Sequence, residues 1–319
     1  MLGRWLIKVV WNPYARFCRV MPLWPFRADL TQPAPGVTCI RIDNIVTRLL
    51  SKFSGGYDYA VCYLVDKTLL VDTGFPWARR CLKKNLILMQ ADQTIKDVVN
   101  THYHEDHTGN NDLLVELCDA NIYAHKLAVP EIRFPPNLPW YRSFLFGPAI
   151  TVEVGTLAGQ ISTPNYNFQV IDTPGHCPGH ICLYEKEQGW LFSGDLYIAA
   201  DLDAQLRDAD GPAWIDSLEK IIQLKPKWLF DAHGIVVKGE AAVGELLYRK
   251  LEFLKTIEQR VITEAKHAQP IAELTRKVFD HHDLSHFLSQ GEGWLSLITA
   301  SDFSRCHVVK SFLKDTQED

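Results

Sequence analysis

The sequence lacks the features that mark several specialised classes of protein. It has eight cysteines but no CxxC pair, no apolar run long enough to cross a membrane, and no internal repeat or low-complexity tract. In a chain of 319 residues, scattered cysteines need no disulfide framework and are typical of buried thiols in a reducing compartment. We therefore expect a cytoplasmic protein without a transmembrane helix.

The first 28 residues contain no acidic side chain and no serine. Their five basic residues leave a net charge of −10 on the other 291 residues, and such an acidic body argues against a broad nucleic-acid surface. The same segment is rich in tryptophan, and Lys8 interrupts its apolar stretch, which disfavours a secretory signal. Residues 1–28 are thus predicted to form an arm that either contacts a membrane interface or packs on the protein's own surface. A mitochondrial transit peptide is a third alternative, which the lack of serine disfavours.

Hydrophobic patterns and turn residues predict strands and helices in alternation up to about residue 240. Strands are expected at 37–42, 57–65, 68–71, 97–100, 121–124, 168–172, 181–184, 190–192 and 228–230, and helices at 76–89, 110–118, 213–224, 241–264, 271–279 and 302–313. This order indicates an α/β layered sandwich in residues 29–240, followed by a C-terminal helical extension in residues 241–319.

The stretch THYHEDHTGN, residues 101–110, carries the strongest chemical signal. It directly follows a predicted buried strand and contains four candidate metal ligands within six residues. His102 and His104 are two positions apart, so in an extended segment both imidazoles point to the same side and can share one metal ion. If the chain turns into a helix there, Asp106 and His107 project toward a second position nearby.

Three further candidates follow predicted strands elsewhere in the chain. His176 lies in TPGHCPGH after a strand and a Pro-Gly turn, Asp195 lies in FSGDL, and His233 lies in FDAHG. Such strand ends are expected to meet along one edge of a sheet, where sites are commonly built. Cys177 is interpreted as structural, because adjacent residues seldom share a metal ion, and His180 as a support of its loop.

The HxHxDH stretch, followed by single His, Asp and His residues at strand ends, resembles the metallo-β-lactamase fold superfamily over residues 37–240. The resemblance implies a four-layer αββα sandwich with a two-metal site. In that site one ion would be held by His102, His104 and His176, the other by Asp106, His107 and His233, and Asp195 would bridge both. VDTG at 71–74 matches an early motif of the family, so Asp72 would orient a ligating histidine. By itself, an aspartate at this place is more often simply a turn residue at the end of a strand.

Such a site predicts hydrolysis. Two divalent ions acidify a shared water, which gives a hydroxide nucleophile near neutral pH, while one ion polarises the carbonyl or phosphoryl oxygen of the substrate. Asp106 is also a candidate catalytic residue that orients this water. Imidazole and carboxylate ligands suit zinc, with iron or manganese as alternatives.

The sequence differs from the motifs of several subgroups of this superfamily, and these differences disfavour the reactions of those subgroups. His104 stands where flavodiiron-type oxidoreductases carry glutamate, and the chain has both the final His of HxHxDH and the bridging Asp, one of which true β-lactamases usually lack. The gap between Asp195 and His233 is too short for the inserted domain of the large nucleases. Lactamase-like hydrolases, glyoxalase II-like thioesterases and lactonases remain, and the C-terminal segment resembles the winged-helix-like extension of the first group.

We therefore expect a metal-dependent hydrolase of a small ester, thioester or lactone. The candidates for an apolar acyl pocket are Trp140, Tyr141, Phe144 and Phe146, in a proline-rich segment (129–148) expected to be an ordered loop, and Tyr197 beyond Asp195. Packing of the loop alone is the alternative role of these aromatics.

Three other functions are alternatives to hydrolysis of an acyl compound. An endoribonuclease or other phosphodiesterase ranks lower, because acidic residues outnumber basic ones in residues 246–319. A mononuclear iron dioxygenase would use only part of the motif. A membrane-docked binding protein with a vestigial site has little support, because no ligand position is substituted.

Overall fold

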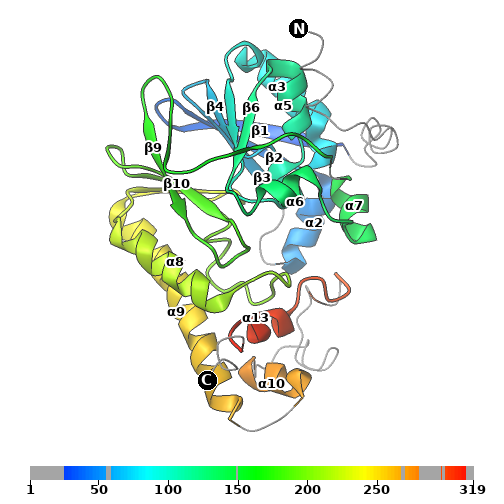
Figure 1. Ribbon diagram of the computed structural model, residues 1–319, viewed down its shortest axis with the longest axis vertical. Helices are drawn as coiled ribbons and strands as arrows, with labels where there is room; N and C mark the ends of the chain where they lie inside the picture. The colour runs from blue at the N-terminus through cyan, green and yellow to red at the C-terminus, as the bar shows by residue number, and fades with distance from the viewer. Residues whose placement is uncertain are drawn as a thin grey trace.

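Two β-sheets pack face to face at the centre of the molecule, with helices on both outer faces (Figure 1). The computed structural model describes residues 25–54, 59–148, 150–266, 270–279, 296 and 299–313. The four layers run helix, sheet, sheet, helix, so the predicted αββα sandwich is confirmed.

The first sheet has the strand order β1 to β7, with antiparallel pairing up to β4 and parallel pairing from there to β7. Its strands are β1 (Arg27–Ala34), β2 (Val37–Asp43), β3 (Ala60–Val65), β4 (Leu69–Val71), β5 (Asp97–Val99), β6 (Asn121–Ala124) and β7 (Gly155–Thr156). The parallel part brings the ends of β4, β5 and β6 to one edge of the sheet.

The second sheet has the order β13-β12-β11-β10-β9-β8, and only β11 and β12 pair in parallel within it. Its strands are β8 (Gln160–Ser162), β9 (Asn167–Asp172), β10 (Ile181–Glu185), β11 (Trp190–Gly194), β12 (Trp228–Asp231) and β13 (Val236–Lys238). The ends of β11 and β12 therefore also open at a shared edge.

Strand β3 shows how the sequence builds these layers. All six of its residues are buried, as expected where both faces of a strand are covered. Cys62 and Leu64 belong to the core under the outer helices, whereas Val61, Tyr63 and Val65 belong to the core between the two sheets. Successive side chains of a strand point to opposite faces, so one strand contributes to both cores.

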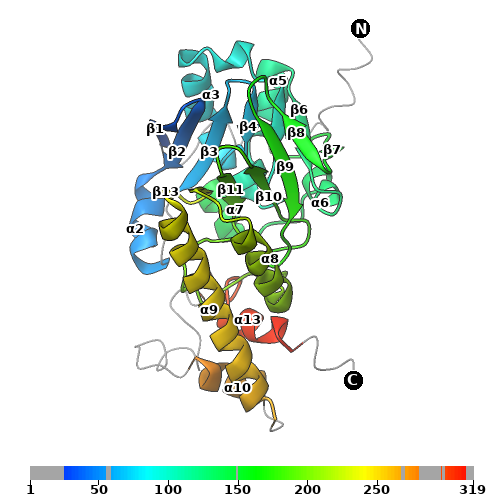
Figure 2. The same ribbon diagram turned by 90° about the vertical axis from the view of Figure 1, so that its left-hand side faces the viewer.

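The outer helices cover the two sheets from opposite sides. Those of the first sheet are α2 (Ile45–Ser54), α3 (Arg79–Leu88), α4 (Glu105–Thr108), α5 (Asn111–Cys118), α6 (Val129–Arg133) and α7 (Trp140–Phe146). Those on the side of the second sheet are α8 (Gly211–Gln223), α9 (Glu240–Glu264), α10 (Ile271–Val278) and α13 (Arg305–Ser311). Figure 2 shows α8 and α9 side by side, with α10 and α13 beside the far part of α9.

The C-terminal helical extension is present, and it shares a hydrophobic core with the body of the molecule. Leu247, Leu251 and Leu254 of α9 pack in one cluster with Leu218 of α8 and Leu191 of β11. The helix begins at Glu240, one residue from the predicted start. A division of the chain at residue 240 and a winged-helix character of the extension stay predictions.

The structure differs from the predicted elements in two regions of the first sheet. Residues 129–148 were expected to form a loop, but they contain α6 and α7, because Pro130 and Pro139 stand at the start of these helices, where proline is well tolerated. Strand β1 and helix α2 were not predicted, and β1 begins inside the proposed N-terminal arm. Residues 1–24 of that arm lie outside the described part of the chain. The short strands β7, β8 and β13 were not predicted either.

Among the described residues, no helix is both long and apolar enough to cross a membrane.

Candidate metal centre

The first sheet supplies four of the predicted ligands from one edge. His102 and His104 follow β5, and helix α4 begins immediately after His104, so Asp106 and His107 project from its first turns. Position 109 in THYHEDHTGN requires glycine, because a Cβ on Gly109 would lie 2.4 Å from the carbonyl oxygen of Gly74. This close approach places α4 against the VDTG loop that follows β4.

The second sheet supplies the other three ligands. His176 lies in the loop between β9 and β10, Asp195 directly follows β11, and His233 lies two residues beyond β12. The loop of His176 passes close to α8, because a Cβ on Gly175 would lie 2.3 Å from Cα of Trp214. Seven residues spread over more than 130 positions of sequence thus reach one place between the two sheets.

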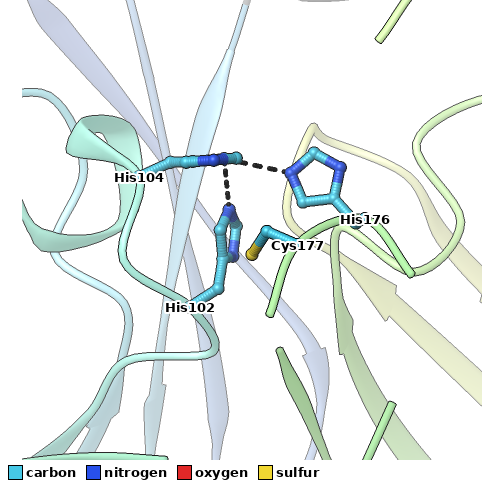
Figure 3. A group of neighbouring side chains, drawn as sticks. All are labelled: His102, His104, His176 and Cys177. Carbon is cyan, nitrogen blue, oxygen red and sulfur yellow. Dashed lines mark hydrogen bonds between the residues drawn. The ribbon is translucent and has the colours of Figure 1, made fainter. Parts of the chain in front are cut away.

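Three histidines form the first group (Figure 3). Nδ1 of His104 lies 2.9 Å from Nε2 of His102 and 3.0 Å from Nε2 of His176. All three side chains are buried. Three ring nitrogens that converge on one point are the arrangement expected of ligands to a single metal ion.

The second group consists of Asp106, His107 and His233. Oδ2 of Asp106 lies 3.6 Å from Nε2 of His107 and 3.8 Å from Nε2 of His233. Both histidines are buried, whereas the Asp106 side chain keeps 19% of its surface exposed. The carboxylate is therefore the member of this group that faces the open side of the site.

Asp195 lies between the two groups, and its carboxylate contacts ring nitrogens of both. Oδ2 lies 3.3 Å from Nε2 of His176, 3.8 Å from Nε2 of His102 and 3.4 Å from Nε2 of His233. Oδ1 lies 3.3 Å from Nε2 of His107 and 3.2 Å from Nε2 of His233. A single carboxylate thus connects the two sets of ring nitrogens.

The hydrogen bonds around the histidines leave the converging nitrogens available. His107 Nδ1 pairs with Oδ2 of Asp72 at 2.9 Å, and His233 Nδ1 pairs with the carbonyl oxygen of Tyr59 at 2.7 Å. In each contact Nδ1–H donates a hydrogen bond to the oxygen, so Nε2 is the nitrogen that faces the site. Nε2 of His107 and Oδ1 of Asp195 are buried without a hydrogen-bond partner in the described part of the chain. Buried polar atoms without partners are costly, and a bound cation would satisfy both.

The charges in this place favour bound cations. Burial lowers the pKa of His102 well below its usual value and that of His176 to about 3, so both imidazoles are neutral. Burial also opposes the charge on Asp195, but the surrounding histidines, His233 and His107 foremost, outweigh it and hold the pKa of the carboxyl well below its usual range. Neutral imidazoles and an ionised carboxylate are the forms that ligate metals.

In the second group, nearby carboxylates raise the pKa values of both histidines. Burial opposes protonation of His107, yet the carboxylates of Asp195, Asp106 and Asp72 outweigh it and raise the pKa of this histidine well above its usual value. The pKa of His233 is raised to about 9, since Asp195 and Asp106 outweigh the effect of burial. Metal ions would replace these protons as the positive charges of the site.

Asp72 contacts the ring of a candidate ligand, the role that the family resemblance implies for it. Besides its contact with His107, it accepts hydrogen bonds from the backbone N–H of Thr101 at 2.8 Å and from the Thr101 hydroxyl at 2.9 Å. Its backbone has a φ of 59°, in the left-handed region where aspartate is better tolerated than most residues. The carboxylate thereby fixes both the ring of His107 and the start of the THYHEDHTGN loop.

His180 supports the loop of Asp195 more directly than the sequence indicated. Its Nε2 accepts the backbone N–H of Asp195 at 2.9 Å, and its Nδ1 lies 2.9 Å from the hydroxyl of Thr173. Burial lowers the pKa of His180 to about 3, so the ring is neutral and can accept this hydrogen bond. His180 therefore holds the backbone of Asp195 in place through this hydrogen bond.

Two features of the site were not predicted from the sequence. The carboxylate of Asp208 accepts a hydrogen bond from the hydroxyl of Tyr103 and lies 3.4 Å from Nε2 of His104, which leaves Nδ1 of His104 facing the other histidines. Glu105, between two predicted ligands, pairs at two points with Arg142 of α7, at 2.6 and 2.5 Å. No motif marks Asp208 or Arg142, since each reaches the site only through the fold.

A pocket of about 340 Å³ opens above the two groups. His104, Asp106, His176, Asp195 and His233 line it on the side of the candidate ligands, and the ion pair of Glu105 and Arg142 also lines it. The rest of the lining is mainly apolar and aromatic: Val46, Thr47, Phe75, Trp140, Tyr141, Phe144, Leu145, Phe146, Leu206, Thr299 and Phe303. The four aromatics predicted from residues 129–148 thus reach the site.

Tyr197 does not line this pocket. It is buried in the core that β11 and α8 share with α9, which corrects the prediction that it contributes to the acyl pocket.

Cys177 lies near the first group (Figure 3), with its sulfur within 4.8 Å of the histidine nitrogens. Burial raises the pKa of the Cys177 thiol well above its usual value, consistent with a structural role.

The chain is similar to known proteins over this same region. The family model described as "Metallo-beta-lactamase superfamily" matches residues 55–233, more than half of the chain. The chain is 27% identical over 208 residues to "Probable metallo-hydrolase YflN" of Bacillus subtilis (strain 168), an alignment that covers 54% of this chain and 77% of the relative.

A second relative matches over a shorter stretch. Identity to "Hydroxyacylglutathione hydrolase" of Maricaulis maris (strain MCS10) is 29% over 143 residues, which covers 44% of this chain and 49% of the relative. The chain thus spans only about half the length of that enzyme. Among solved structures, a beta-lactamase domain protein from Burkholderia ambifaria aligns with a TM-score of 0.65 and 18% identity, covering 91% of this chain and 89% of the other. This likeness shows the shared fold.

Proposed function

Because this chain belongs to the metallo-beta-lactamase superfamily and is a metallo-hydrolase of that fold, we propose that it cleaves an ester, thioester or lactone bond of an acyl compound with two divalent metal ions. The observation that carries the proposal is the position of Asp195, whose carboxylate lies within 3.3 Å of ring nitrogens from both groups of histidines. A carboxylate placed in this way suits a bridge between two cations.

The proposed ligand sets follow from the two groups and the central carboxylate. One ion would be held by His102, His104 and His176, the other by Asp106, His107 and His233, and Asp195 would serve both. Nitrogen and carboxylate ligands suit zinc, while iron and manganese remain alternatives that a metal analysis would separate. When bound, such ions lower the pKa of a water molecule and polarise the carbonyl oxygen of the substrate.

The residues of the chain have distinct tasks in this proposal. Asp106, the most exposed of the candidate ligands in the second group, faces the pocket and is placed to orient the attacking water through its carboxylate. Asp72 and Asp208 hold the rings of His107 and His104 so that their free nitrogens face the ions. The aromatic walls would take the acyl group and exclude bulk water from the reacting carbonyl.

The electrostatics of the pocket support an acyl substrate over a phosphodiester. Among its described lining residues, Arg142 is the only arginine or lysine, and its guanidinium is already paired with Glu105 and lies 3.4 Å from Asp302. A nucleic-acid backbone needs several available cations, which this lining does not provide. An apolar acyl chain needs none.

A substrate panel tests the proposal. Purified protein would be assayed on a water-soluble chromogenic ester, an acyl thioester, a lactone, a phosphodiester and single-stranded RNA, before and after treatment with a chelator. We expect turnover of at least one acyl compound that the chelator abolishes and added metal restores. Chelator-sensitive cleavage of RNA or of the phosphodiester, with none of the acyl compounds turned over, would overturn the proposed substrate class.

A further inference from the structure

Two pairs of large apolar side chains are exposed on helices of the first sheet. Ile45 and Leu49 lie four residues apart on α2, with 64% and 55% of their surface exposed. Trp140 and Phe144 lie four residues apart on α7, with 78% and 44% exposed, and their ring centroids are 6.3 Å apart. Residues four apart share one face of a helix, so each pair forms a continuous apolar stripe. We call these four residues the rim.

The two helices that carry the rim both line the pocket. Val46 and Thr47 of α2 line the pocket from one side, and Trp140 and Phe144 of α7 line it from another. Figure 1 shows α2 and α7 on the same side of the molecule. Exposed apolar side chains grouped around an opening mark an interaction surface more often than isolated ones do.

The N-terminal segment joins the body beside the rim. Phe26 packs on Phe75 with ring centroids 5.8 Å apart, and Phe75 in turn stacks on Phe146 of α7 at 4.8 Å. Arg27 pairs with Asp43 at 2.8 Å, immediately before α2. The described chain therefore begins next to both rim helices. The 24 residues that precede it in the sequence contain three tryptophans and four basic residues, with no acidic one.

We infer that the rim is a lipid-docking face, and that a long-chain acyl substrate passes from a bilayer with anionic headgroups through it into the pocket. The inference rests on the proposed function. A tryptophan-rich basic segment complements anionic headgroups, and exposed apolar helix faces beside it would enter the boundary of the acyl chains. A bilayer at the rim would keep the pocket mouth in contact with the substrate. A second copy of the protein seated on the rim would instead close the pocket mouth.

The test compares the protein of residues 1–319 with a rim variant that leaves the pocket lining intact. Ile45→Gln with Leu49→Gln makes the α2 stripe polar without altering any residue that lines the pocket. The matched control is Tyr248→Gln with Ile262→Gln on α9, two exposed apolar residues with 53% and 43% of their surface exposed. Co-sedimentation with vesicles of phosphatidylcholine and phosphatidylserine measures binding. Size-exclusion chromatography measures self-association.

We expect the wild type and the control to bind these vesicles, and the rim variant to bind at least about tenfold more weakly. Turnover of a long-chain acyl ester embedded in the vesicles should fall in parallel, while turnover of a short water-soluble ester stays within about twofold. The inference is overturned if the wild type stays in the supernatant, or if the rim variant sediments as well as the wild type. It is also overturned if the rim substitutions only convert a dimer to a monomer.

Vesicle binding is measured without any reaction, so the docking face and the proposed hydrolase function can be tested independently. A protein that binds vesicles through the rim but hydrolyses no acyl compound would contradict the proposed function and leave the docking face standing. A protein that hydrolyses the short ester but never binds vesicles would contradict the docking face alone.

Discussion

Arg142 and Glu105 form a buried two-point ion pair that joins the pocket helix α7 to the helix that carries Asp106 and His107. Only about a tenth of the Arg142 side chain and less of Glu105 is exposed. Asp302 of the C-terminal segment lies 3.4 Å from the same guanidinium and accepts a hydrogen bond from Tyr141 at 2.5 Å. The aromatic wall of the pocket and the candidate metal ligands are thereby held in one arrangement.

Loss of either member of this pair should be costly. Arg142→Met would leave the Glu105 carboxylate buried without its partner, and we expect the free energy of unfolding to fall by about 3–5 kcal/mol in urea titrations. The double variant Arg142→Met with Glu105→Gln removes the stranded charge and should recover part of this loss.

A surface ion pair provides the control for this experiment. Arg133 pairs with Glu153 where both side chains are well exposed, so Arg133→Met should cost no more than about 1 kcal/mol. Equal losses in the Arg142 and Arg133 variants would show that the buried pair does not stabilise α7.

Asp72 is expected to act through His107. Asp72→Ala removes the acceptor that holds Nδ1 of His107, and we expect metal affinity and hydrolysis to fall about 10- to 100-fold while the protein stays folded. Asp172→Ala is the matched control, an aspartate at the end of another strand with 65% of its side chain exposed. Metal titration of both variants checks the expectation, which fails if they bind metal equally well.

The pocket wall should select for acyl chain length. Phe144→Ala enlarges the apolar pocket beside α7, so KM should rise about 10-fold or more for long acyl chains and change little for an acetyl ester. Phe134→Ala is a suitable control, because this phenylalanine is 75% exposed and does not line the pocket. The same change in KM for long and short acyl chains in the Phe144 variant would argue against an acyl pocket at this wall.

Lys250 should make stability depend on pH. It is buried on α9 beside Trp214 and donates a hydrogen bond to the carbonyl oxygen of Ala199 at 3.1 Å. Burial lowers the pKa of Lys250 to about 7, which the nearby carboxylates of Asp201 and Asp203 only partly counter. The folded pKa lies below the unfolded one, so the unfolded chain binds more protons between pH 7 and about 10 and stability contributed by this group rises with pH there.

The comparison with Lys250→Met isolates this effect. From pH 6.5 to pH 9, the free energy of unfolding of the wild type should rise by more than about 1 kcal/mol relative to that of the variant. Lys255→Met, an exposed position on the same helix, should follow the wild-type profile. Parallel pH profiles of the wild type and the Lys250→Met variant would contradict a buried, partly neutral lysine.

Part of the candidate metal centre could be predicted from the sequence because its chemistry is local. His102 and His104 are two residues apart after a strand, and the structure brings them to one point for that reason. Strands such as β3 and β12 were predicted because their runs of apolar residues reflect burial on both faces. The C-terminal helix α9 was predicted from its apolar spacing, and its inward residues are buried as expected.

What the sequence did not predict depends on contacts between distant segments. Asp208 and Arg142 reach His104 and Glu105 from positions 104 and 37 residues away, and nothing near them marks such a role. Strand β1 was missed because most of its residues are exposed at the edge of the sheet, so its apolar alternation is weak. Tyr197 was placed in the pocket from its nearness in sequence to Asp195, but the chain turns it into the core.

The central claim is that Asp195 connects two metal ions, and a metal count per chain tests it most directly. Elemental analysis of protein purified without chelator, on the wild type and on Asp195→Asn, is the measurement. We expect two divalent ions per wild-type chain, and one or none with little hydrolysis in the variant, whose melting temperature shows that it is folded. One iron per wild-type chain with consumption of oxygen, or an unchanged metal count in the variant, would contradict the account.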